Sequence, residues 1–462
     1  MTLRLTLALT LLAVSPAVAQ PTPAIQPAEV ESTFEKDLDA LFSPGGLTSD
    51  QAAARGTKTS PEVQRSIAEI EIAIAQAQAA ELARVPQVGA NLSYTRLSDI
   101  DQALIPLGGM SFSFPVFLNQ YSATARATVN LSDYVVRYPK LIQAARLGEE
   151  VARLSKRSSE VDAGQDARIA YYEWVRAKLQ NLIAKRQLEQ VRTTLRQVRA
   201  LAEAQRLSRA DLMRVESQES QAEQASIQLQ NLTDLREEQL RLIIDAPADQ
   251  ALTIGEDIRV DIAAPGATPL VDLLGTAKQQ RLDFKVLNTG IEAKEKQREA
   301  EKASYYPKLS AFAQGEYSNP NQRIFPLVDE FNFTWAVGAQ ITWTLNETLF
   351  AKTVDRRLRG ETNALRADRN NLERGTRIQL LAAQQSVAIA QAALATSAKG
   401  LAAAEEGYRV RRELLNAQRA TAVELVDAET DLTRARIAAL NARVDLRVAM
   451  VELTHALGND AK

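Results

Sequence analysis

The chain of 462 residues contains no cysteine and only one histidine, His455. The lack of cysteine excludes disulfides, thiolate catalysis and cysteine-based zinc or iron–sulfur sites. A single histidine near the C-terminal end is typical of a surface or packing residue, and a Ser-His-Asp site built on it is not expected. The abundant Asp and Glu residues form no catalytic pattern either. We therefore expect no enzyme activity, no metal site and no cofactor.

The sequence also lacks a surplus of positive charge and a long apolar run. Lys and Arg number 55 against 57 Asp and Glu, which gives a formal net charge of −2 and a pI of about 5.9. A nucleic-acid partner is not expected without a basic surface. No segment beyond the N-terminus offers about 18 consecutive apolar residues, so no transmembrane helix is expected.

The N-terminal segment has the pattern of a secretory signal peptide. Arg4 precedes an apolar run over 5–14, and small residues at 17–19 form a cleavage site. We expect residues 1–19 to be removed, and no cysteine follows that could carry a lipid anchor. Residues 20–50 contain several prolines and are expected to form an extended lead-in.

Proline is missing from two long stretches that are rich in Ala, Leu, Gln, Arg and Glu. The first, 140–246, predicts a helix that would rise roughly 100 Å before a break near 205–211, followed by a returning helix to about 244. The second runs from about 345 to 457. Helices this long need lateral packing, so each stretch predicts a helical hairpin of the coiled-coil kind.

Four segments show the period-2 alternation of strands, namely 88–97, 121–132, 309–317 and 331–345. In the last of these, Trp335, Val337, Ile341 and Trp343 fall on one parity and polar residues on the other. A membrane strand of roughly 9–11 residues has this pattern, with the apolar side toward lipid and aromatic residues at the interfaces. A long amphipathic strand of a soluble sheet has it too. The alternation alone favours neither.

The order helix, strand, loop, strand, long hairpin occurs twice, over 51–246 and 281–462, with a linker at 247–280. Gln205-Arg206 recurs as Gln418-Arg419 at the break of each hairpin. The repeat predicts one duplicated unit with four long strands in all. Four strands cannot close a barrel with a lumen, and open edges would be unsatisfied in lipid. Several copies are therefore expected to share one barrel, which favours the membrane interpretation of 331–345.

The duplicated layout and the segments 204–212, 306–309 and 419–428 resemble the TolC-like outer-membrane efflux protein family. The resemblance covers the chain from about residue 50. It implies a mainly α protein with a β membrane part: a homotrimer with a shared twelve-stranded barrel in outer-membrane lipid and a long periplasmic α-helical tunnel. It also implies a periplasmic adaptor protein and an inner-membrane transporter as partners.

The resemblance carries over to residues near the hairpin tips. It implies that acids matching Glu424 and Asp427 line the tunnel entrance, and that Asp211 helps to latch it, with Arg419 as a candidate partner. Family members usually have glycine at each tip, where this chain has Gln205 and Gln418. The tips and their neighbours Arg206 and Arg419 are expected to dock the adaptor.

Glu424, Asp427 and Asp431 share one helix face, so three copies would form a ring of carboxylates that selects cations. An ordinary solvated acidic face is the alternative.

These observations predict a passive outer-membrane channel that exports drugs, small toxic compounds or metals. One alternative is a conduit for type I protein secretion. Another, from a different class, is a soluble periplasmic coiled-coil adaptor or scaffold, which should lack aromatic-rich alternating strands.

Overall fold

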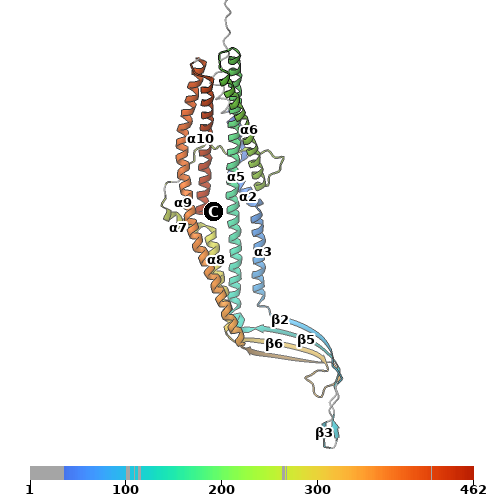
Figure 1. The fold of residues 1–462 in the computed structure, drawn as a ribbon. Coiled ribbons are helices and arrows are strands. Elements are labelled where there is room, and N and C mark those ends of the chain that lie inside the picture. The colour runs from blue at the N-terminus through green and yellow to red at the C-terminus, as the bar shows by residue number, and fades with distance from the viewer. Residues whose placement is uncertain are drawn as a thin grey trace, which may run out of the picture.

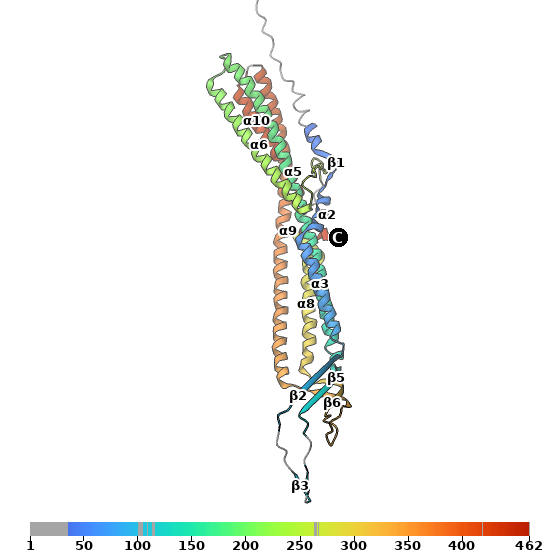
Figure 2. The same cartoon turned by 90° about the vertical axis from the view of Figure 1, so that its right-hand side faces the viewer.

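The structure is a computed structural model that describes residues 36–99, 105–108, 110–112, 116–262, 266, 268–417 and 419–461. The expected signal peptide and Gln418 lie outside these residues. The molecule is elongated, with two helical hairpins side by side at one end and a sheet at the other (Figures 1 and 2).

The long axis is formed by two helical hairpins. The first consists of α5 (Tyr138–Glu203) and α6 (Arg209–Ile244), and the second of α9 (Leu345–Asn416) and α10 (Ala422–Leu457). The 66 residues of α5 and the 72 of α9 span about 100 Å each. The hairpins that the proline-free stretches predict are therefore present.

Shorter helices support these hairpins. Toward the sheet, α3 (Pro61–Leu82) lies along α5, and α8 (Leu282–Glu301) lies between α5 and α9 (Figure 1). α2 (Ser49–Thr59) and α7 (Leu270–Gln280) cover the middle of the molecule. The remaining short elements are α4 (Leu131–Val135), η1 (Lys302–Tyr305) and η2 (Asn459–Ala461).

The main hydrophobic core lies at mid-length, where α2, α5, α6 and α10 meet. Tyr171 and Trp174 of α5 are fully buried there, next to Leu240 of α6 and Val444 of α10. β1 (Phe42–Leu47) joins this core through parallel bridges to Ile254. The last part of the expected extended lead-in therefore contains a short strand that is held by backbone pairing and apolar contacts.

The sheet contains four antiparallel strands in the order β2, β5, β6, β7. Their bounds are Gln87–Arg96, Asn119–Asn130, Lys308–Asn319 and Asn332–Thr342. A small hairpin of β3 (Ile105–Leu107) and β4 (Met110–Phe112) extends beyond it. β7 is shorter than the expected strand 331–345, because the chain turns at Thr344 to begin α9, and Trp343 follows the end of the strand.

Helix α9 bears on the expectation that the chain has no transmembrane helix. Within the described residues, α9 contains an 18-residue window with a mean hydropathy of 1.3, and 11% of that window is buried. Length and composition alone are weak grounds for a membrane span, because core helices of soluble proteins meet them too. Leu380, Ala383 and Val387 of α9 belong to a buried cluster that includes residues of α7 and α10.

Candidate functional site

The strand register places most of the apolar residues of the four strands on one face of the sheet. Trp335 pairs with Gly315, Val337 with Ala313 and Ile341 with Leu309, so the apolar face of β7 continues on β6. The same face continues through β5 to β2, where it includes Val88, Ala90, Leu92 and Tyr94.

This face has no covering element in the described chain. Trp335 is 70% exposed, Val337 71% and Ile341 74%, and Trp343 just past the strand is 59% exposed. Large apolar side chains in such a contiguous, uncovered patch mark an interaction or membrane surface.

Aromatic rings gather at the end of the sheet that is far from the helices. The ring centroids of Tyr94 and Tyr121 are 5.0 Å apart, those of Tyr121 and Phe331 6.0 Å, and those of Tyr317 and Phe331 5.2 Å. At the helix end, Tyr306 and Trp343 are exposed. Aromatic residues at both ends of an apolar band are typical of strands that cross a bilayer.

The opposite face of the sheet is polar, with residues such as Ser122, Thr124, Gln314, Thr334 and Gln340. Arg126 also lies on it, with its guanidinium 5.2 Å from the centroid of the Phe312 ring. Gly338 makes room for this ring, because a Cβ there would lie 2.9 Å from Phe312 Cζ. The polar face is therefore suited to line water.

The first hairpin tip contains a residue with strained backbone. Gln205 has a φ of 56°, in the left-handed region that favours glycine. Its N–H donates to the Ala202 carbonyl at 3.0 Å, and the Arg206 N–H donates to the Leu201 carbonyl at 2.9 Å. This is the Schellman pattern that satisfies carbonyl groups at a helix end.

The second tip closes in a similar way, although Gln418 lies outside the described residues. The Arg419 N–H donates to the Leu414 carbonyl at 2.8 Å, the same six-residue closure as in the first tip. The Ser208 hydroxyl accepts from the Asp211 N–H, and the Thr421 hydroxyl accepts from the Glu424 N–H. Each returning helix is thus capped by a hydroxyl side chain with an acid in its first turn.

The acids near the tips have partners within the chain. Asp211 accepts a hydrogen bond from the Ser208 hydroxyl at 2.7 Å. Because Ser208 is only three residues away, this local hydrogen bond at the helix cap occupies one oxygen of the Asp211 carboxylate. Its expected role as a latch, with Arg419 as a candidate partner, stays a prediction.

Glu424 lies 3.5 Å from an Arg411 guanidinium nitrogen, and Asp427 lies 3.4 Å from one of Arg214. Neither arginine was expected from the sequence. Arg214 stands 213 positions before Asp427, the same offset as between the tips, and this spacing could have pointed to it. All four side chains are about half exposed. The structure thus places Glu424 and Asp427 at the tip end of α10, each beside a positive charge.

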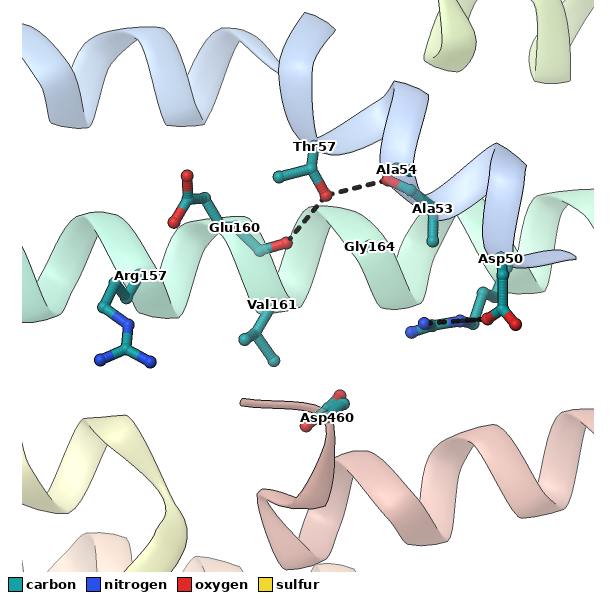
Figure 3. Close-up of a pocket in the computed structure, with 10 residues that line it drawn as sticks. Asp50, Ala53, Ala54, Thr57, Arg157, Glu160, Val161, Gly164 and Asp460 are labelled. Carbon is teal, nitrogen blue, oxygen red and sulfur yellow. Dashed lines mark hydrogen bonds and ion pairs between the residues drawn. The ribbon is translucent and has the colours of Figure 1, made fainter. Parts of the chain in front are cut away.

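A surface pocket lies elsewhere, between α2, α5 and η2, and has a volume of about 340 Å³ (Figure 3). The Thr57 hydroxyl donates to the Ala53 and Glu160 carbonyls, and Arg168 pairs with Asp50. Near it, His455 contacts Asp460 and Asp162 at 2.9 and 3.4 Å. Within the described residues no group of three or more His, Asp or Glu could hold a metal ion.

Comparison with solved structures identifies the fold. The MtrE outer-membrane channel of Neisseria gonorrhoeae matches 90% of this chain and 89% of its own, with a TM-score of 0.73 and 17% identity. The CmeC outer-membrane channel of Campylobacter jejuni matches 97% and 91%, with a TM-score of 0.73 and 12% identity. The chain has the fold of these outer-membrane channels.

A third structure with this fold is the outer-membrane protein VceC of Vibrio cholerae. It matches 92% of this chain and 97% of its own, with a TM-score of 0.69 and 17% identity. No family profile matches the sequence, and no curated protein is significantly similar to it. The fold of the TolC-like channels, expected from the duplicated layout and a few short segments, is therefore confirmed by these solved structures.

Proposed function

We propose that the chain is one subunit of a passive outer-membrane export channel, in which three copies share a twelve-stranded barrel. The observation that supports this most is the open sheet, with one apolar exposed face and, within the described residues, no strand paired along the outer edges of β2 and β7. Lipid cannot satisfy such edges. Pairing of β2 with β7 of a neighbouring copy would remove them and enclose a polar lumen.

The helices would then form a tunnel in the periplasm. Helix, strand, strand and long hairpin follow one another twice, as α3, β2, β5, α5, α6 and as α8, β6, β7, α9, α10. We interpret this order as a duplication, which would give a trimer six similar hairpins around one axis.

The tunnel would receive its substrates from an inner-membrane transporter through a periplasmic adaptor that docks at the hairpin tips. Arg206 and Arg419, which close the two tips in the same way, are candidate docking residues. A photo-cross-linking residue at either position should capture an adaptor in intact cells. Cross-links that never include one would count against this docking site. Transport would need no chemistry in the channel, because the inner-membrane partner supplies the energy.

Two alternatives lead to different expectations. A conduit for type I protein secretion would use the same barrel and tunnel with another transporter, and deletion strains tested for drug sensitivity and for secreted proteins would separate the two. A soluble periplasmic adaptor or scaffold is disfavoured by the aromatic-rich apolar face of the sheet, since that surface would be in contact with water.

Membrane fractionation followed by cross-linking of detergent extracts tests the proposal. We expect the protein in the outer-membrane fraction, with cross-linked species up to three subunits. A soluble monomer would refute it.

A further inference from the structure

Glu429 of α10 is a buried carboxylate with no ion-pair partner within 4 Å among the described residues. Its exposed fraction is 3%. One oxygen accepts a hydrogen bond from the Thr194 hydroxyl of α5 at 3.2 Å, and the other, Oε2, has no hydrogen-bond partner. A buried charge with an unsatisfied oxygen is costly, so this position favours a protonated carboxyl group.

The charge that acts on Glu429 from α9 is that of Arg412, and α5 provides the neutral Thr194 hydroxyl. Tyr408 of α9 lies close to Glu429 and is itself influenced by Arg412 and by Arg436 of α10. The Arg412 guanidinium lies over the Tyr408 ring, 5.1 Å from its centroid, rather than pairing with Glu429. On α10 itself, Thr433 donates to the backbone carbonyl of Glu429.

Glu429 also lies close to the apolar contacts that join the two hairpins. One turn away, Val426 packs with Ala422 of α10 against Leu195 and Val198 of α5. These apolar contacts hold the second hairpin against the first near the tips. A charge on Glu429 is best hydrated when α10 moves away from α5, and such a movement would loosen the same contacts.

We propose that Glu429 is a proton-dependent latch that holds the α9–α10 hairpin against α5 when protonated and releases it when ionised. In a channel this movement would widen the tunnel entrance, a consequence that depends on the proposed function. The latch itself requires only the contacts within one chain.

The direction of the pH response follows from the pKa. Burial raises the pKa of Glu429 from an ordinary value of 4.5 to about 7, while the Thr194 hydrogen bond and the Arg412 charge limit the rise. Between about pH 5 and pH 7 the separated state is ionised and the packed state is not. The ratio of separated to packed hairpins should then increase about tenfold per pH unit and level off above about pH 7.

The test measures the distance between the two tips in the full-length protein. The chain has no cysteine, so spin labels at Arg206→Cys and Arg419→Cys are specific. Labelled copies are mixed sparsely with unlabelled ones, so that pulsed EPR reports the distance within one chain. We expect this distance to increase between about pH 5 and about pH 8, and Glu429→Gln to retain the short distance throughout.

Two further variants sharpen the test. Asp431→Asn changes an exposed acid on the same helix, paired with Arg434, and should keep the original response. Thr194→Val removes the donor that lowers the pKa of Glu429 in the packed state, so the increase in tip distance should continue to a higher pH before it levels off. This variant preserves side-chain shape and tests the latch even if Glu429→Gln fails to fold.

The outcomes separate the two proposals. A tip distance independent of pH, or a normal response in Glu429→Gln, overturns the latch while an outer-membrane trimer still supports the channel. A normal latch response in a soluble monomer supports the latch and overturns the channel.

Discussion

Gln205 shows how a single residue sets the geometry of a hairpin tip. Its left-handed backbone, with a φ of 56°, closes the turn between α5 and α6 through two backbone hydrogen bonds. Non-glycine residues in this region are strained by about 1 kcal/mol. The two hydrogen bonds therefore hold Gln205 in a backbone conformation that favours glycine.

Replacement of Gln205 by glycine should stabilise the tip by up to about 1 kcal/mol, since glycine adopts this conformation without a Cβ penalty. Amide hydrogen exchange at Arg206 and Leu207 should become slower. The matched control is Gln228→Gly, in an exposed helical position of α6, which should destabilise its helix by about 1 kcal/mol. Equal effects of both variants would contradict the role assigned to the turn.

Gly338 is the other residue whose small size matters. A Cβ there would lie 2.9 Å from Phe312 Cζ, and moving this ring would disturb its contact with Arg126. Gly338→Ala should lower the free energy of unfolding by about 1–3 kcal/mol, measured as a shift in the urea midpoint in detergent. Gly89→Ala serves as the control, because nothing lies within 4 Å of a Cβ there. A harmless Gly338→Ala would show that Phe312 moves freely.

At the scale of elements, the strand register decides which residues share the apolar face of the sheet. In every strand the alternate positions that are mainly apolar lie on the same face. A shift of the register by one residue in any strand would therefore place polar residues on that face. Trp335, Val337 and Ile341 remain predicted lipid contacts, and their exposure in a single chain agrees with that role.

Neighbouring positions on β7 offer a direct test of this orientation. Ala339→Lys places a charge on the apolar face and should cost about 2–4 kcal/mol near the middle of the bilayer. Gln340→Lys places it on the polar face and should be tolerated. The measurement is the yield of assembled protein in the outer membrane. Equal yields of the two variants would show that the assigned orientation is wrong.

At the scale of the whole molecule, the entrance acids acquire their predicted role only in a trimer. Three copies of Glu424 and Asp427 around one axis would attract cations and repel anions. The nearby Arg411 and Arg214 partly offset this charge within each chain. The net selectivity therefore depends on which of these groups faces the lumen.

Single-channel recording in a planar bilayer tests the acids. Wild-type protein should prefer cations and be blocked by a trivalent cation from the tip side, and Glu424→Ala with Asp427→Ala should lose most of both properties. Arg214→Ala is the informative control, since removal of the charge beside Asp427 should increase the preference for cations. Unchanged selectivity and block in the double variant would identify these acids as a solvated helix face.

The sequence by itself determined the elements and their order. Proline-free stretches of helix formers define the two hairpins, and period-2 alternation defines the strands, because both patterns are local properties of the chain. The family resemblance, carried by the duplicated layout and a few short segments, then led to the fold that the solved structures share.

Only the tertiary structure decided which distant residues meet. The pairing of β5 with β6 joins strands almost two hundred positions apart, and nothing local in either strand selects that partner. The ion pair of Arg214 with Asp427 and the burial of Glu429 against Thr194 likewise arise from the packing of separate helices. In the sequence Glu429 is one of many acids on a long helix. Its unusual chemistry comes from the apolar contacts between hairpins that exclude water around it.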